Sequence, residues 1–257
     1  ICGNGAADLV FGLVHACMPR RGLVTAPAFS EYEQAMVTCG CRVDHLFLEE
    51  KEGFSLDTEV LLQRITGAAG EGRPYDMVFL CNPNNPTGIP VPAGEIRRAA
   101  QVCRGSGTRL IMDECFCDFL DGPEACSVIP FLEEYPNLFV LKAFTKLYAM
   151  AGLRLGYCLS DDRTLLAAMA EEGPPWPVSQ LAQQAGISAL GAPLSLSGTE
   201  QAAVPRLPKR LQFPAVPGGG GLAGAPAGPG HPDPELRRLP GAVSWLLPRL
   251  RQEPRGK

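Results

Sequence analysis

The chain has 257 residues, of which 46% are hydrophobic and 19% charged, and its formal net charge is −4. This mild acidity, without clusters of lysine or arginine, argues against a surface for nucleic acid. No apolar run reaches the roughly 18–20 residues that a membrane-spanning helix needs, so we expect a cytoplasmic protein that binds neither nucleic acid nor membrane.

The start of the chain and its cysteines give two further expectations. The chain begins at Ile1, without an initiator methionine or the basic region of a signal peptide, so a fragment or a processed chain is expected. The ten cysteines are scattered. The closest pairs, Cys39 with Cys41 and Cys115 with Cys117, lack the spacing of typical metal-binding pairs. We predict reduced thiols, several of them in the core, and no metal.

Helical and strand-like segments alternate from residue 1 to about residue 190. The first helix carries its apolar residues on one face, and Ser30 and Asp57 are predicted N-caps. Short apolar segments between the helices are typical of buried strands, the last of them antiparallel. The predicted helices are 8–18, 30–39, 57–69, 92–103, 162–172 and 179–190, and the predicted strands are 22–27, 42–48, 76–81, 109–113, 138–142 and 153–159.

This alternation favours an α/β fold, a mostly parallel sheet flanked by helices, over residues 1–190. Residues 191–257 differ sharply, because proline and glycine are frequent there, as in 217–221. Such a composition does not sustain a helix or a strand. We predict a low-complexity or disordered tail, of the kind that a shift in the reading frame would also leave.

A lysine and an arginine follow the strand 138–142. Lys146 stands in a short polar turn with Thr145 beside it, and Arg154 follows among small residues. A lysine whose proton affinity is lowered by partial burial can attack an aldehyde, and a guanidinium suits a phosphate. Either residue alone is more often a solvated surface cation. Together they indicate a site for a phosphorylated aldehyde.

Two polar residues follow the preceding strands. Asp113 ends the strand 109–113, at the edge of an α/β sheet where ligands bind, and its carboxylate could pair with a pyridinium N–H. Asn85, in the loop 82–88, could donate its amide N–H to a phenolic oxygen. Alone, Asp113 is equally an N-cap or loop residue, and the Asn85 loop is equally a simple turn.

The remaining candidates lie near the start of the chain. Gly5, Ala6 and Ala7 open the first helix, where backbone N–H groups could bind a phosphate, although a plain tight turn has the same pattern. Phe29 could lie flat against an aromatic ring, or simply belong to the core. The whole set predicts pyridoxal 5'-phosphate (PLP) as the cofactor.

These residues resemble the fold-type I PLP enzymes of the class I/II aminotransferase superfamily, in the branch that holds histidinol-phosphate aminotransferase and threonine-phosphate decarboxylase. The resemblance covers roughly residues 1–190. It implies that Lys146, which bonds covalently to the cofactor, and Asp113, which pairs with its pyridine nitrogen, are catalytic. The cofactor-binding residues that it implies are Gly5, Ala6, Ala7, Phe29, Asn85, Asp113, Thr145, Lys146 and Arg154. It also implies a homodimer.

The sequence departs from that superfamily in three ways. Phe116 stands where many relatives have tyrosine, and Ala143 where a serine usually helps to hold the phosphate. The segment expected before Ile1 and the small domain expected after residue 190 are not recognisable, so we expect truncation at both ends. These parts normally supply an arginine for the substrate carboxylate and a tyrosine from the partner subunit.

The reaction stays open between two chemistries on one cofactor. Segments 29–33, 144–152 and 175–179, together with Phe116, resemble the threonine-phosphate decarboxylase branch, which serves cobalamin biosynthesis. We therefore expect a decarboxylase acting on an amino-acid phosphate. The alternatives are a histidinol-phosphate-type aminotransferase and a catalytically inactive fragment that exposes an apolar face.

Overall fold

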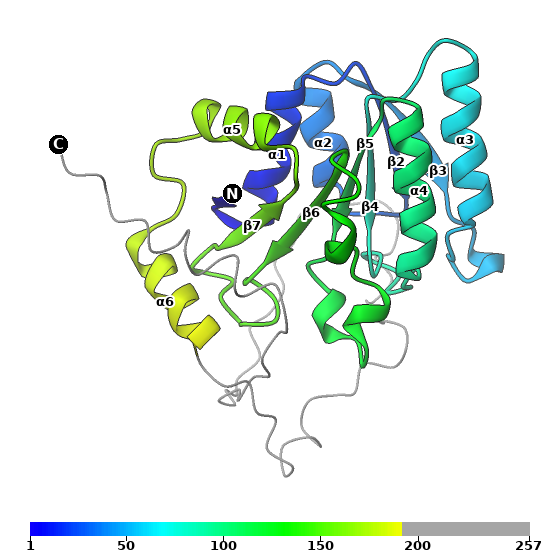
Figure 1. The fold of residues 1–257 in the computed structure, drawn as a ribbon. Coiled ribbons are helices and arrows are strands. Elements are labelled where there is room, and N and C mark those ends of the chain that lie inside the picture. Colours follow the sequence, from blue (N-terminus) through cyan, green and yellow to red (C-terminus); the bar gives the residue numbers. More distant parts are fainter. Residues whose placement is uncertain (192–257) are drawn as a thin grey trace, which may run out of the picture.

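The fold is seen in a computed structural model that describes residues 1–191 (Figure 1). Strands and helices alternate through most of this range, as predicted. The strands are β1 (Cys2–Gly3), β2 (Arg21–Ala26), β3 (Arg42–Phe47), β4 (Met77–Cys81), β5 (Arg109–Asp113), β6 (Leu138–Ala143) and β7 (Gly156–Leu159), and the helices are α1 (Gly5–Cys17), α2 (Glu31–Thr38), α3 (Thr58–Gly70), α4 (Ala93–Gly105), α5 (Arg163–Glu172) and α6 (Gln180–Gly191). Four short 3-10 helices lie at Glu50–Glu52, Cys117–Phe119, Pro123–Ala125 and Ile129–Phe131.

The strands form one seven-stranded sheet in the order β1-β7-β6-β5-β4-β2-β3. The five strands β3, β2, β4, β5 and β6 are parallel to one another, and β7 is antiparallel to both β6 and β1. The predicted α/β class and the antiparallel last strand are therefore confirmed. Parallel strands need long crossovers, which α2, α3 and α4 supply.

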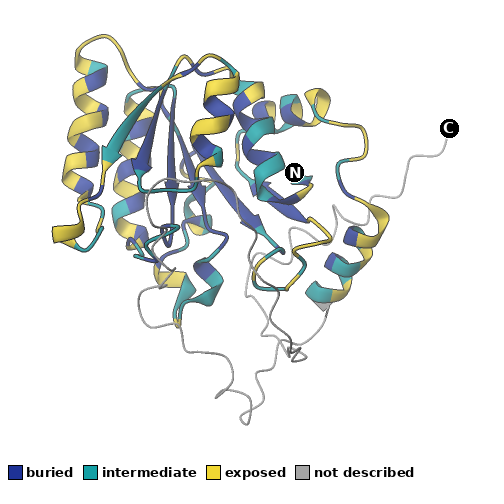
Figure 2. Ribbon diagram, turned by 180° about the vertical axis from the view of Figure 1, so that it is seen from behind, coloured by how far each residue is buried: buried dark blue, intermediate teal, exposed yellow. Residues whose placement is uncertain are grey.

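Helices cover both faces of the sheet, so the central strands are buried on each side. Alternate residues of a strand point to opposite faces: Val78 and Leu80 pack with α3 and α4, whereas Met77 and Phe79 pack with α1 and α2. Figure 2 shows the same arrangement, with buried residues along the strands and exposed ones on the outer faces of the helices. This layering leaves the ends of the strands as the places where polar side chains can gather.

The helix starts agree with the sequence in one case and differ in another. Asp57 caps α3 as predicted, because its Oδ1 accepts bonds from the backbone N–H groups of Glu59 and Val60 at 2.9 and 3.2 Å. Ser30 makes no capping hydrogen bond. Its backbone is already helical, with φ −64° and ψ −23°, whereas a capping side chain needs an extended backbone. The predicted Ser30 cap is therefore wrong.

The start of the chain holds one feature that the sequence pattern did not predict, the strand β1. α1 begins at Gly5, where the glycine-containing segment opens it and three residues before the apolar pattern starts, and Asp8 Oδ2 accepts the backbone N–H of Asn4 at 2.8 Å. β1 is only two residues long, and it exists because it pairs with β7, with Gly3 opposite Gly156. A strand this short leaves no periodicity in the sequence.

All ten cysteines fall within the described range as free thiols. Burial raises the pKa of Cys17 and Cys41 to about 11 and of Cys103 to about 12.

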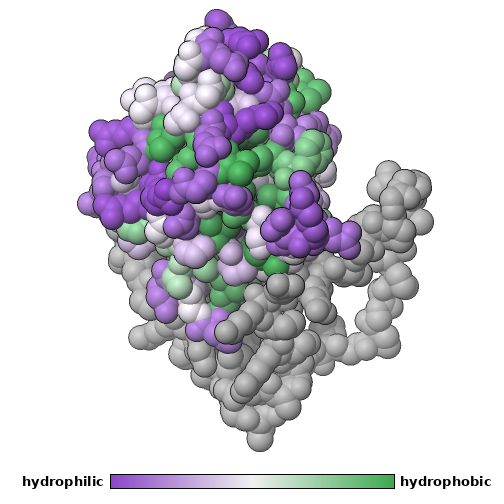
Figure 3. Space-filling view, turned by 90° about the vertical axis from the view of Figure 1, so that its right-hand side faces the viewer, coloured by the Kyte–Doolittle hydropathy of each residue, from purple (hydrophilic) through white to green (hydrophobic). Residues whose placement is uncertain are grey.

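The surface on the α3 side of the molecule mixes hydrophilic and hydrophobic side chains (Figure 3). Among residues 1–191 no helix is both long and apolar enough to cross a membrane. The predicted tail, 191–257, lies outside the described residues from 192 on.

Candidate active site

The carboxyl ends of three neighbouring strands bring the candidate residues together. Asp113 is the last residue of β5, and its register partners are Cys81 at the end of β4 and Leu141 near the end of β6. Asn85 follows β4 in the next loop, and Lys146 follows β6 in the next turn. The sequence placed these residues after separate strands, and the sheet order makes those strands adjacent.

Asp113 is a buried carboxylate, 6% exposed, with both oxygens held. The hydroxyl of Tyr32 donates to Oδ2 at 2.6 Å, and the backbone N–H of Cys115 donates to Oδ1 at 2.9 Å. Each oxygen keeps a further lone pair that can accept a hydrogen bond. A fixed acceptor at the edge of the sheet suits a ligand that carries an N–H donor.

Lys146 lies in the turn after β6 and is exposed. Its backbone carbonyl accepts the N–H of Ala149 at 3.0 Å, and its Nζ lies 5.6 Å from the centroid of the Phe116 ring. Thr145 beside it is half-buried. The partial burial expected for Lys146 is thus not present in this structure, where the residue is exposed. Its amine is accessible to an incoming aldehyde.

Arg154 lies directly against the first turn of α1. A Cβ atom placed on Gly5 would stand 2.6 Å from Nη2 of Arg154, so a side chain there would displace the guanidinium. Gly5 also has φ +83°, which favours glycine. Arg154 itself has φ +58°, an uncommon conformation for a residue with a side chain. Two unusual backbone positions therefore hold a cation at a helix start.

β7 approaches the same helix start just as closely. A Cβ atom on Gly156 would lie 2.6 Å from the carbonyl carbon of Gly5 and 2.7 Å from the backbone N of Ala6. The N–H groups of a first helical turn, here those of Gly5, Ala6 and Ala7, have no partner within the helix. They carry the positive end of the helix dipole, which repels the guanidinium of Arg154 unless an anion lies nearby. The N–H groups of this first turn and the guanidinium of Arg154 together fit a phosphate group.

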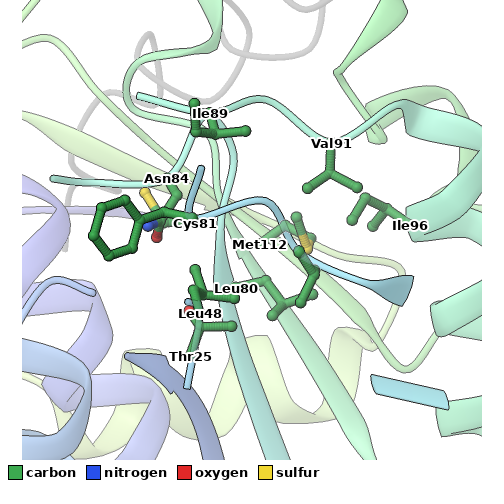
Figure 4. A pocket seen from close by; sticks show the side chains of 11 residues that line it. Thr25, Leu48, Leu80, Cys81, Asn84, Ile89, Val91, Ile96 and Met112 are labelled. Atoms are coloured by element: carbon green, nitrogen blue, oxygen red, sulfur yellow. The ribbon is translucent and has the colours of Figure 1, made fainter. Parts of the chain in front are cut away.

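The loop after β4, which lies beside Asp113, is held in place by side-chain hydrogen bonds. Asn84 Nδ2 donates to the carbonyl of Pro27 at 3.1 Å and to Thr87 Oγ1 at 3.0 Å. Among the described residues, its buried Oδ1 finds no hydrogen-bond partner. Asn84 also lines a small, mostly apolar pocket with Thr25 and Cys81 (Figure 4). The half-buried Asn85 follows in this loop, where its amide is available to a ligand.

Phe29 is half-buried in the segment between β2 and α2. Its ring meets the ring of Tyr32 edge to face, with centroids 5.5 Å apart, and Tyr32 in turn stacks on Phe79 at 5.0 Å. The chain of contacts links Phe29 to the residue that holds Asp113. Phe29 is therefore one ring contact away from the residue that donates to the Asp113 carboxylate.

Sequence patterns missed two groups near the site. Tyr32 gave no signal beyond an aromatic residue at a helix start. Lys142, within β6, is buried and donates to Asp118 Oδ1 at 2.8 Å, and Glu114 lies 3.9 Å from its Nζ. Burial lowers the pKa of Lys142, but the carboxylates of Asp118 and Glu114 outweigh it and raise the pKa above its usual value. The signal that could have revealed Lys142 is that a lysine occurs within an otherwise apolar predicted strand.

The geometry agrees with the sequence comparison. The family model "Aminotransferase class I and II" matches residues 1–213. The chain belongs to this family. Its members depend on PLP, and the residues described here fit that cofactor: an anion site of Arg154 and the α1 start for the phosphate, and the Asp113 carboxylate for the pyridine nitrogen. Within residues 1–191 no group of three or more His, Cys, Asp or Glu could hold a metal ion.

Two kinds of relative bear on the reaction. The chain is 36% identical to threonine-phosphate decarboxylase of Salmonella typhimurium, over 74% of this chain and 50% of the relative. It is 37% identical to histidinol-phosphate aminotransferase of Desulfitobacterium hafniense, over 74% and 51%. The crystal structure of histidinol-phosphate aminotransferase from Clostridium acetobutylicum superposes with a TM-score of 0.65 at 26% identity, over 73% and 52%. The chain thus spans about half the length of the curated relatives it matches.

Proposed function

We propose that this chain is the cofactor-binding part of a PLP-dependent enzyme that decarboxylates an amino-acid phosphate, threonine phosphate first of all. The observation that supports this most is the contact between the Arg154 guanidinium and the first turn of α1. With Asp113 at the end of β5, it gives two separated polar sites. They match the two polar ends of PLP, the phosphate and the pyridine nitrogen.

Each candidate residue receives a definite role in this proposal. Bound PLP supplies an electron sink for a carbanion at the substrate Cα. Lys146 attaches the cofactor through its amine and carries protons to or from Cα. Asp113 accepts the hydrogen bond of the protonated ring nitrogen. Arg154 binds the phosphate together with the backbone of Gly5, Ala6 and Ala7.

Three further residues orient the ring. Asn85 donates to its phenolic oxygen, Phe29 packs against its face, and Thr145 borders the attachment point. Phe116 offers no hydroxyl, so the second donor found in many relatives is absent at this position. The arginine for the substrate carboxylate is not among the candidates in residues 1–191, and we propose that it comes from another part of the protein and that the enzyme is a homodimer.

The choice of reaction rests on the relatives and not on the cofactor residues, which serve both chemistries. The Salmonella typhimurium relative supports a decarboxylase. The Desulfitobacterium hafniense relative, at 37% identity, favours histidinol-phosphate-type aminotransfer as a second candidate. The reactions differ in which bond at Cα breaks, the bond to the carboxylate or the bond to hydrogen.

Cofactor attachment is tested first. The chain is mixed with PLP, reduced with borohydride, digested and analysed by mass spectrometry. We expect a pyridoxyl label on Lys146 and no label on Lys51, an exposed lysine elsewhere. A chain that takes no label at Lys146 would contradict the proposal, and a catalytically inactive fragment would then be the remaining interpretation.

The reaction is tested next with two substrates. O-phosphothreonine should release CO2 without any keto acid. Conversion of histidinol phosphate that depends on a keto acid and releases no CO2 would replace the decarboxylase with the aminotransferase. A labelled chain that acts on neither substrate would show that this chain binds the cofactor without turning over.

A further inference from the structure

Tyr32 is a buried tyrosine at the start of α2. Its ring packs against other rings, and its hydroxyl makes a hydrogen bond. Only 1% of the residue is exposed. Its ring stacks on Phe79 with an interplanar angle of 7° and meets the edge of Phe29. A phenylalanine could make both of these ring contacts. The hydroxyl therefore needs a separate explanation.

That explanation lies in the carboxylate of Asp113. The Tyr32 hydroxyl donates to Oδ2 at 2.6 Å, the short distance of a bond from O–H to an ionised acceptor. The backbone N–H of Cys115 donates to the other oxygen, Oδ1, at 2.9 Å. With one donor on each oxygen, the plane of the carboxylate is fixed, and its remaining lone pairs point in fixed directions.

The hydroxyl also stays a donor. Burial raises the pKa of Tyr32 well above its usual value, and the negative charge of Asp113 raises it further. The proton therefore remains on Tyr32 throughout the neutral range. Tyr32 and Asp113 are 81 residues apart in sequence, and α2 and β5 meet here through the fold alone.

We propose that Tyr32 is a positioning residue for the cofactor: its hydroxyl sets the Asp113 carboxylate in the orientation that accepts the pyridine N–H. This inference rests on the proposed PLP site and extends it to a residue outside the candidate set. It predicts that the hydroxyl governs cofactor affinity and the protonation of the ring nitrogen, and not only the stability of the fold.

The test compares two tyrosines that each donate to a carboxylate. Tyr32→Phe removes the proposed donor. Tyr75→Phe is the matched control, because Tyr75 is also 1% exposed and donates to Asp44 at 3.0 Å, away from the strand ends that carry the site. For each protein, PLP affinity is measured by equilibrium dialysis, and ring-nitrogen protonation by NMR of PLP labelled with 15N at that nitrogen.

We expect Tyr32→Phe to bind PLP about tenfold more weakly, which corresponds to about 1.4 kcal/mol, because an Asp113 carboxylate that is no longer fixed accepts a poorer hydrogen bond from the ring nitrogen. The nitrogen signal should shift toward the unprotonated form. Tyr75→Phe should change neither measurement. Wild-type affinity and an unchanged nitrogen signal in Tyr32→Phe would overturn the inference, and so would an equal loss in Tyr75→Phe.

A double-variant cycle covers the case in which Tyr32→Phe does not fold. In an Asp113→Asn background no buried charge is left without a donor, and removing the hydroxyl should cause no further loss of PLP affinity. A further loss equal to that expected in the wild type would show that Tyr32 acts by another route. Failure of the wild type to take the Lys146 label would instead refute the proposed function itself.

Discussion

Lys142 and Asp118 form a buried ion pair that joins β6 to the segment after β5. Nζ of Lys142 lies 2.7 and 2.8 Å from the two carboxylate oxygens, and both side chains are largely shielded from solvent. Glu114, fully buried nearby, accepts bonds from Ser127 Oγ and the Val128 N–H. The cluster fixes the segment that carries Phe116 against the strand that leads to Lys146.

Removing the lysine of this cluster should destabilise the fold strongly. Lys142→Met leaves the Asp118 and Glu114 carboxylates buried without their cation, which costs about 3–5 kcal/mol when one partner of a buried pair is lost. Urea unfolding followed by circular dichroism measures the change. Lys142→Arg keeps the charge and should stay closer to wild type. Equal unfolding midpoints for Lys142→Met and wild type would show that the pair contributes nothing.

Lys146→Ala should separate cofactor chemistry from stability. The residue is exposed, so its truncation should change the free energy of unfolding by no more than about 0.5 kcal/mol. The borohydride label should disappear. Lys51→Ala, at another exposed lysine, should keep the full label. Label retained on the chain after Lys146→Ala would assign the attachment to a different amine.

Arg154→Asn tests the anion site and its backbone together. Asparagine tolerates positive φ better than most residues with a side chain, so the fold should be retained despite φ +58° at this position. The loss of a charge-assisted contact should weaken PLP binding by about tenfold or more. The measurement is PLP affinity with and without competing inorganic phosphate. Competition that is as strong in Arg154→Asn as in wild type would remove Arg154 from the site.

The stability of the fold should depend on pH through Asp44, which lies in the edge strand β3. Burial alone would raise the pKa of Asp44, but hydrogen bonds from Arg21 and Tyr75 outweigh it and hold the pKa below its usual value of 3.8. A lowered folded-state pKa stabilises the fold above about pH 4, and this contribution is lost as the pH falls through the folded-state pKa.

Asp44→Asn should therefore be less stable than wild type at pH 7, and the difference should shrink as the pH falls below about 4. Thermal unfolding of both proteins across this range measures it. Asp57→Asn is a suitable control, since asparagine is also a good N-cap. A stability difference for Asp44→Asn that does not depend on pH would contradict the assignment of the ion pair.

The sequence predicted those parts of the fold that depend on local pattern. Apolar runs marked β4 and β5, and the carboxylate of Asp57 marked the start of α3, because each feature lies within a few residues of its effect. The ends of these strands then placed Asp113 and Asn85 at one edge. What remained hidden depends on distant partners. The bond from Tyr32 to Asp113 and the pairing of Gly3 with Gly156 leave no local mark.

Burial of side chains near turns was also beyond the sequence. The expectation of partial burial for Lys146 failed because the exposure of a turn depends on what packs over it, and the pattern of the turn itself contains no such information. Lys142, four positions earlier, is the buried lysine instead, since it lies within the strand and has Asp118 as a partner. The two lysines have opposite surroundings within one short segment.

The pairing of β1 with β7 has a consequence for how this polypeptide is made. The amine of Ile1 donates to the carbonyl of Cys158, and the Cys158 N–H donates to the carbonyl of Ile1. As a ribosome extends the chain, Cys2–Gly3 is made long before Gly156–Leu159 and can join the sheet only after that strand has emerged. A nascent chain that ends after β6 already contains Asp113 and Tyr32. It lacks both Arg154 and Gly156, the two residues that lie against the first turn of α1.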